Sequence, residues 1–290
     1  MSDLLEKTIA IFGAGGKMGC RIADNFRDTP HKVLYVEVAP AGVQRLTERG
    51  LKTTPHEEAV AKADVAILAL PDSAIGAVAP TIVPGLKPGA MVICLDPAAP
   101  HGGQLPARAD ICYFITHPCH PPVIHDETEP AAQMDFFGGI AAKQHIVCAL
   151  MQGPEENYPI GESICREMFA PVMNSYRVTV EQMAILEPAL SETVAATCMT
   201  VIREAIDEAA RRGVPEEAAR QFILGHIKVN IGILFGYIGS PFSDGALLAI
   251  DRGKKKLFQP DWKSVFEPEN VMAEVQAIVN NPGRTAQKAS

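Results

Sequence analysis

The chain has 290 residues, of which 47% are hydrophobic, and it carries a formal net charge of −8. This length has room for two domains with substantial cores, and the acidic balance argues against nucleic acid or an anionic membrane as a partner. We expect no leader segment, and the apolar stretch 222–238 is interrupted by His226, Lys228 and Asn230, so no membrane span is expected. The seven cysteines form no CxxC pair, which is typical of a cytoplasmic protein with reduced thiols.

A glycine-rich turn follows the first predicted strand, residues 9–12, and precedes a predicted helix over residues 20–26. This order presents backbone N–H groups at a helix N-terminus to the pyrophosphate of a dinucleotide. Gly13 permits the tight turn, and Gly19 allows the helix to pack close to the strand. Gly15 or Gly16 lets the phosphate approach the backbone. The expected cofactor-binding residues of the turn are Gly13, Ala14, Gly15, Gly16, Lys17, Met18 and Gly19.

A second predicted strand, residues 31–36, ends at an acidic residue, Glu37, which comes 18 residues after Gly19. A carboxylate at this place can accept hydrogen bonds from the ribose hydroxyls of the adenosine. No arginine follows to hold a 2′-phosphate, so the pattern favours NAD over NADP. The alternative is a glycine turn and a surface acid in another kind of α/β domain.

Four further apolar runs predict the remaining strands, at residues 63–70, 91–95, 111–115 and 145–150, the last of them closing the sheet. Continuous apolar runs are typical of strands buried on both faces, and they predict an α/β fold with a doubly wound parallel Rossmann sheet. Ligands bind beyond the carboxyl ends of such strands. The residues expected there, near the nicotinamide, are Leu70, Pro71, Asp72, Ser73 and Asp96. For the two aspartates, a helix cap or turn is the alternative role.

Helical patterns replace strand patterns from about residue 155, with helices expected at 191–212, 215–237, 243–258 and 268–280. We therefore expect a Rossmann domain over residues 1–152 and an all-helical domain for substrate and dimerisation over residues 153–290. The 215–237 helix is apolar nearly all round, so it should be buried at a domain or subunit interface. His226 and Asn230 share one of its faces, where they could line a pocket or sit in the core.

Three histidines, His117, His120 and His125, follow the strand at 111–115 within nine residues. The prolines between them exclude a helix, so the segment is a stiff loop at a strand's carboxyl end. Neutral imidazoles at such a place can bind a divalent metal or relay protons, and His117 is the best placed. A rigid loop with solvated histidines is the alternative.

Glu192 leads an apolar stripe along the predicted 191–212 helix. Burying a charge without a partner is costly, so we expect a metal, a histidine or a substrate hydroxyl beside it. Glu187, just before Pro188, could reach the same place. The alternative for Glu192 is an acid favoured at a helix N-terminus by the helix dipole.

The 13–19 turn, Glu37, the strand ending at Pro71-Asp72 and the segment 87–93 together resemble one superfamily. It contains 6-phosphogluconate and β-hydroxyacid dehydrogenases, prephenate dehydrogenases and ketol-acid reductoisomerases, in which a Rossmann domain precedes an all-helical domain that often forms a dimer. Residues 116–122 and 187–192 resemble the D-apionate oxidoisomerase group. The motif around Lys228 is similar to that of 6-phosphogluconate dehydrogenases but comes later in the chain, so no catalytic lysine is carried over.

The resemblance implies a homodimeric enzyme that oxidises a small sugar acid with NAD and couples this to a metal-assisted rearrangement. His117 and Glu192 are the expected metal ligands, and His120 or Glu187 the base. The preference for magnesium comes from the resemblance alone. A metal-free dehydrogenase of the hydroxyacid or prephenate type, with His117 as acid/base and Glu192 orienting it, stays open. So does an NAD-binding sensor without turnover.

Overall fold

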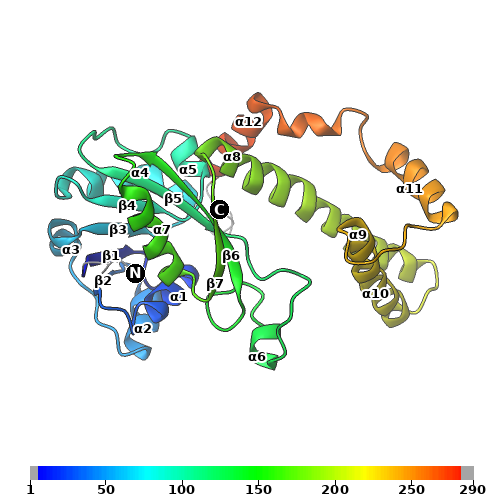
Figure 1. Ribbon diagram of the computed structural model, residues 1–290, viewed down its shortest axis with the longest axis horizontal. Coiled ribbons are helices and arrows are strands. Elements are labelled where there is room, and N and C mark those ends of the chain that lie inside the picture. Colours follow the sequence, from blue (N-terminus) through cyan, green and yellow to red (C-terminus); the bar gives the residue numbers. More distant parts are fainter. Residues whose placement is uncertain (1–5, 282–290) are drawn as a thin grey trace. The chain divides into compact units, whose positions relative to one another are not determined.

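The computed structural model describes residues 6–281, and within them one seven-stranded sheet has the order β2-β1-β3-β4-β5-β6-β7 (Figure 1). The strands are β1 (Thr8–Phe12), β2 (Lys32–Val36), β3 (Val65–Leu68), β4 (Met91–Cys94), β5 (Cys112–Pro118), β6 (Gln144–Gln152) and β7 (Val172–Arg177). In this part of the chain β5 and β6 run antiparallel and the other neighbours are parallel. The Rossmann prediction is confirmed, with a mixed rather than a purely parallel sheet.

The seventh strand corrects the prediction that residues 145–150 close the sheet. β7 has the sequence VMNSYR and is largely exposed, as befits a strand at the edge of a sheet. It has no continuous apolar run, because most of its side chains are exposed, so little of either face is covered by apolar packing. A search for the apolar runs that are typical of buried strands therefore does not detect β7.

The antiparallel step between β5 and β6 follows from their connection. Residues 119–143 contain one short helix, α6 (Pro130–Gln133). A parallel return would need a crossover that packs on a face of the sheet. The 119–143 segment instead stays at the carboxyl edge of β5, so β6 runs back.

Helices cover both faces of the sheet. One apolar core lies under α1 (Lys17–Asn25), α2 (Pro40–Glu48) and α7 (Asn157–Met168). The other lies under α3 (His56–Lys62), α4 (Asp72–Ile82), α5 (Ala98–His101), α8 (Val180–Ala184) and α12 (Pro268–Val279). Side chains alternate between the cores along β1, with Ile9 and Ile11 in the first and Ala10 and Phe12 in the second.

The chain divides into two compact units at a later point than expected. The N-terminal unit contains the residues up to 187 and those from 272 onward, and the helical unit contains residues 188–271. The boundary expected at 152/153 would separate α7, β7 and α8 from the sheet they pack on. A buried Val275 and Val279 place α12 with the N-terminal unit as well.

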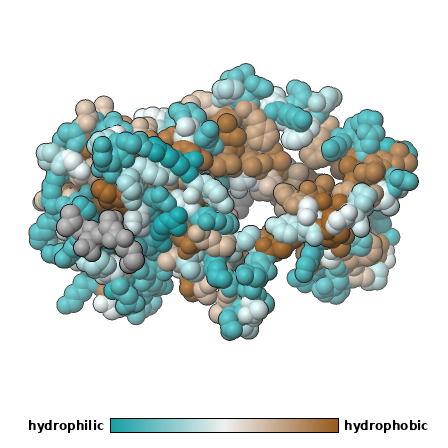
Figure 2. Space-filling model, in the orientation of Figure 1, coloured by the Kyte–Doolittle hydropathy of each residue, from teal (hydrophilic) through white to brown (hydrophobic). Residues whose placement is uncertain are grey.

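The helical unit contains α9 (Thr197–Arg211), α10 (Glu216–Leu234) and α11 (Asp244–Leu257). The 215–237 helix, expected to be buried, is largely exposed in the single chain: within α10 only Gly232 is buried, and α9 and α11 have no buried residue. Figure 2 shows hydrophobic side chains at the surface of these helices. By length and composition alone, the continuous helix Val180–Arg211 could cross a membrane, and the core helix of a soluble protein passes the same test.

Candidate active site

The glycine-rich turn lies at the carboxyl end of β1 and begins α1. Gly13 has a φ of 81°, and a Cβ there would lie 2.4 Å from the carbonyl oxygen of Ala69, so only glycine fits. A Cβ on Gly19 would lie 2.2 Å from the carbonyl oxygen of Gly13, so this glycine lets α1 pack against the turn, as expected. Among the described residues no side chain caps α1 at Gly16, which leaves N–H groups of its first turn for a phosphate.

Glu37 lies at the carboxyl end of β2 and holds the turn in place. Its carboxylate accepts hydrogen bonds from the backbone N–H of Gly15 (3.0 Å), Val38 (2.8 Å) and Ala39 (2.9 Å). A Cβ on Gly15 would meet the backbone of Gly42 in α2 at 2.4 Å, so packing against α2 requires glycine here. The fixed negative charge of Glu37 would repel a 2′-phosphate at this place.

Asp72 begins α4 after β3, and Asp96 follows β4; each accepts a hydrogen bond from a backbone N–H at the start of α5. The backbone N–H of Ala99 donates to Asp72 (3.1 Å), and that of Ala98 donates to Asp96 (2.8 Å). Burial, and then the neighbouring charge of Asp96, raise the pKa of Asp72 to about 6. Both aspartates therefore have the alternative role of stabilising a turn, and each of these two bonds uses the Oδ1 atom. Leu70, Pro71 and Ser73 flank Asp72 in the same connection.

Asp96, His117 and Glu187 form a cluster at the carboxyl ends of β4 and β5, in which one donor atom from each lies within 4.8 Å of the others. The Nε2 atom of His117 is 3.6 Å from Asp96 Oδ2 and 3.8 Å from Glu187 Oε1. His117 Nδ1 donates to the carbonyl oxygen of Pro118 (2.9 Å). A carbonyl oxygen only accepts, so the neutral ring carries its proton on Nδ1 and turns the Nε2 lone pair toward the two carboxylates.

Local structure explains how Glu187 reaches this cluster. Thr179 and Gln182 form a capping box that begins α8. Residues Ile185–Ala196 then form a π-helix containing Pro188, which has no N–H to continue a regular α-helical pattern. Glu187 therefore lies in the first turn of the π-helix, and such turns are frequent at functional sites.

His120 also lies on the 119–143 segment, and its backbone is unusual. Its φ of 60° makes it the one non-glycine residue with positive φ among residues 6–281. Its Nδ1 donates to the carbonyl oxygen of Phe137 (2.9 Å), which leaves Nε2 as an acceptor. The rings of His117 and His120 lie edge to face, with centroids 6.0 Å apart.

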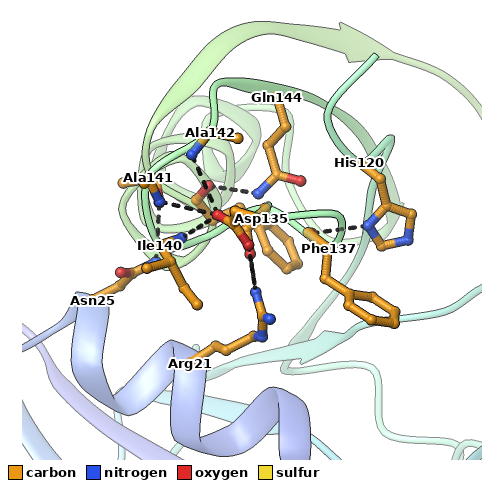
Figure 3. Close-up of polar contacts among 12 residues, drawn as sticks. Arg21, Asn25, His120, Asp135, Phe137, Ile140, Ala141, Ala142 and Gln144 are labelled. Atoms are coloured by element: carbon orange, nitrogen blue, oxygen red, sulfur yellow. Dashed lines mark hydrogen bonds and ion pairs between the residues drawn. The ribbon is translucent and has the colours of Figure 1, made fainter. Parts of the chain in front are cut away.

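A buried carboxylate, Asp135, anchors the 119–143 segment to α1 (Figure 3). Its Oδ2 accepts hydrogen bonds from the backbone N–H of Ile140 (3.0 Å), Ala141 (3.0 Å) and Ala142 (3.3 Å). Its Oδ1 lies 3.2 Å from Arg21 of α1, which also donates to the Gly138 carbonyl oxygen. This network was not predicted, since no periodic pattern accompanies a single acid in a long loop.

Several predicted site residues are not part of this cluster. His125 is exposed on the same segment. Glu192 lies in the helical unit and is exposed in the single chain, so the expected burial of its stripe is wrong for the isolated chain. His226 is exposed on α10 and donates to the Phe222 carbonyl oxygen (2.8 Å), and Lys228 and Asn230 are exposed on the same helix.

Comparisons with known proteins agree with this arrangement. Residues 3–124 match the family "Acetohydroxy acid isomeroreductase, NADPH-binding domain", and residues 125–279 match "Phosphogluconate dehydrogenase (decarboxylating) C-term". A D-apionate oxidoisomerase of Rhizobium rhizogenes is 54% identical over 93% of this chain and 98% of its own length. One of Cupriavidus necator is 50% identical over 94% of this chain and 100% of its own.

A solved structure from Cupriavidus necator, described as a semialdehyde dehydrogenase NAD-binding protein in complex with calcium and NAD, has the same fold. It superposes with a TM-score of 0.92 at 50% identity, over 94% of this chain and 100% of that one. Identity at this level over nearly the whole of both chains confirms the resemblance found in the turn and the histidine segment. The chain belongs to the D-apionate oxidoisomerase family of oxidoreductases.

Proposed function

We propose that this protein oxidises D-apionate with NAD and couples the oxidation to a metal-assisted rearrangement of the carbon skeleton. The observation that carries the proposal is the Asp96–His117–Glu187 cluster, which lies at the strand ends where a nicotinamide is expected. The names of relatives at 50–54% identity support the substrate and the reaction. When bound, NAD accepts the hydride, and a divalent cation polarises the substrate oxygen.

The cluster suits a divalent cation by its donor set. Two carboxylates and a neutral imidazole can bind magnesium, manganese or zinc, and carboxylates with water favour magnesium. Donors about 2.1 Å from one ion lie roughly 3–4 Å apart, close to the 3.6 and 3.8 Å found around His117 Nε2. Asp96 and Glu187 would thus join His117 as ligands, and Glu192 would need the helical unit to bring it there.

The Pro118 carbonyl accepts from His117 Nδ1, which favours the tautomer whose Nε2 atom can bind a metal. Outer-shell partners of metal-bound histidines act in the same way. His120 is the base we propose for the hydroxyl proton, because its Nδ1–H is engaged with Phe137 and its Nε2 is unprotonated in the neutral ring. On the cofactor side, the N–H groups at the start of α1 would hold the pyrophosphate. Glu37 would accept from the ribose and so favour NAD.

The function is tested by incubating the purified enzyme with D-apionate and NAD and following both NADH and the product skeleton. After removal of metal with EDTA, we expect turnover to disappear and to return with magnesium. Turnover that survives EDTA, with an unchanged skeleton, would select the metal-free dehydrogenase. If the protein binds NAD but turns over neither D-apionate nor another hydroxy acid, the hypothesis of a non-catalytic NAD-binding sensor would be the one that remains.

The ligand set is tested with Glu187→Gln and Glu192→Gln. The first should raise the magnesium concentration needed for half-maximal activity by at least about 10- to 100-fold, the loss that removing even an outer-shell partner of a metal ligand causes. Glu204→Gln, exposed on α9, is the matched control. If Glu192→Gln raises the magnesium concentration needed for half-maximal activity and Glu187→Gln does not, the ligands would be His117 and Glu192, as expected from the sequence.

We further propose that the helical unit pairs with a second copy of this chain. Large apolar side chains with more than half their surface exposed gather on it, including Phe222 (66%), Leu234 (68%), Phe235 (74%) and Leu257 (70%). An apolar groove of about 400 Å³ lies between α9 and α10. Exposed apolar surface of this extent marks an interface, and light scattering should give a dimer mass. A monomer, or recovery only with membranes, would contradict the pairing.

The place of the enzyme in the cell is also a proposal, namely the cytoplasm. All seven cysteines are unpaired, and five of them are buried as small apolar side chains. Free cysteines in this number are typical of a reducing compartment. The net charge of −8 supports a protein without a nucleic-acid partner. Fractionation of cells that carry a tagged copy tests the location.

A further inference from the structure

A small cavity lies beside His117 and His120. The charged side chains that line it differ in sign from the acidic cluster of Asp96 and Glu187. The cavity has a volume of about 240 Å³ and lies between the start of α1 and residues 117–120. Its lining includes two cationic side chains, Lys17 and Arg21, and two histidines, His117 and His120, and it includes no carboxylate. Most of the remaining lining is apolar, so an anionic group would bind at the part of the cavity where the cationic side chains lie.

The two cations of the cavity differ in their partners. Arg21 is paired with Asp135 (3.2 Å), so its charge is largely compensated. Lys17 forms no ion pair with any residue in 6–281, and its Nζ lies 3.4 Å from the centroid of the Phe137 ring. The ring face attracts the ammonium and holds it at the cavity, while other N–H bonds of the ammonium stay available.

His117 lies at the border between this cationic cavity and the acidic cluster. It lines the cavity, and its Nε2 atom faces Asp96 and Glu187. A hydroxy acid has one negatively charged end and several hydroxyls. Placed across His117, it would direct its carboxylate to the ammonium of Lys17, which has no ion-pair partner among residues 6–281, and its hydroxyls to the cluster and the cation proposed there.

We propose, resting on the function proposed above, that Lys17 binds the carboxylate of the sugar-acid substrate and so sets its orientation. The sequence assigned Lys17 to the cofactor through its place in the glycine turn. Its backbone belongs to that turn, whereas its side chain lies against Phe137 of the 119–143 segment. Phe137 and the Asp135 anchor are then positioning residues, because they hold the ring that holds the ammonium.

The experiment measures the binding of D-apionate to the NADH-loaded enzyme and of NAD to the enzyme alone, by calorimetry, together with KM for D-apionate. Lys17→Met should weaken D-apionate binding and raise KM on the order of 10- to 100-fold, as for one charge-assisted hydrogen bond, and leave the Kd for NAD within about threefold. Lys17→Arg keeps the charge and should recover most of the affinity. Lys32→Met is the control. This exposed lysine begins β2, so it lies at the amino-terminal ends of the parallel strands, opposite the carboxyl ends where the cavity lies.

A second readout compares D-apionate with its amide, which has the same shape and no charge. The wild-type enzyme should discriminate between them, and Lys17→Met should lose most of that discrimination. Phe137→Leu should raise KM by a few-fold, since it removes the ring face alone.

The outcomes separate the two proposals. Discrimination that persists in Lys17→Met, or a Kd for NAD that rises tenfold with D-apionate binding unchanged, overturns the carboxylate assignment and leaves the function standing. A wild-type enzyme that binds NAD but neither binds nor turns over D-apionate overturns the proposed function and this assignment with it.

Discussion

Replacing Asp135 by alanine should destabilise the N-terminal unit strongly, because this one carboxylate satisfies four groups. Its side chain is 2% exposed, and it accepts three backbone hydrogen bonds besides its pair with Arg21. The change leaves three N–H donors and a guanidinium without their acceptor. We expect a loss of about 3–5 kcal/mol in the free energy of unfolding, the range for breaking a buried pair.

The sign of the pH dependence follows from the pKa of Asp135. Burial alone would raise this pKa, but hydrogen bonds from the N–H groups of Ala141 and Ala142 and from the Arg21 side chain outweigh burial and hold the pKa below its ordinary value of 3.8. Its stabilisation is therefore complete above pH 3.8 and is lost as the pH falls through the lowered folded-state pKa. The difference in the free energy of unfolding between the wild type and Asp135→Ala should therefore become smaller only in that acidic range.

Urea unfolding of wild type, Asp135→Ala and Asp135→Asn at pH 7, 5 and 3.5 tests this. Asparagine keeps one acceptor oxygen and should lose less, about 1–3 kcal/mol at pH 7. Asp126→Ala, exposed on the same segment, should stay within about 0.5 kcal/mol of wild type. A loss below about 1 kcal/mol for Asp135→Ala at pH 7, or one that already narrows between pH 7 and 5, would refute the reasoning.

Three further outcomes are expected. Burial and the neighbouring Asp96 raise the pKa of Asp72 from 3.8 to about 6, so stability should fall as the pH rises through this window. In metal-free protein Asp72→Asn should remove that fall and add up to about 3 kcal/mol at pH 8, and unfolding curves at pH 4 and 8 check it. Gly19→Ala would place a Cβ 2.2 Å from the Gly13 carbonyl oxygen. The variant should lose about 1–3 kcal/mol in the free energy of unfolding and bind NAD more weakly. An unchanged Kd for NAD in calorimetry would contradict this. Glu37→Gln removes the charge that repels a 2′-phosphate, so the NAD/NADP ratio of kcat/KM should fall at least about tenfold, and an unchanged ratio would remove Glu37 from cofactor choice.

Much of the sheet was predictable because its strands are buried on both faces. Continuous apolar runs mark β1, β3, β4 and β6, and glycine spacing marks the turn before α1. β7 was missed because most of its side chains are exposed, so it carries no continuous apolar run. The domain boundary was placed too early for the same reason, since β7 and its neighbours pack on the sheet.

For the candidate site, the local sequence determined which strand ends carry chemistry: the turn of 13–19, Asp96 after β4, and His117 at the carboxyl end of β5. The apolar pattern of each strand and the residues that follow it suffice for that, since both are short-range properties. Only the tertiary structure decided which acid joins His117, because Glu187 is distant in sequence and reaches the cluster through the fold of α8 and the π-helix. Likewise, only the fold of residues 119–143 places Phe137 under Lys17, a contact between segments whose sequences carry no shared pattern.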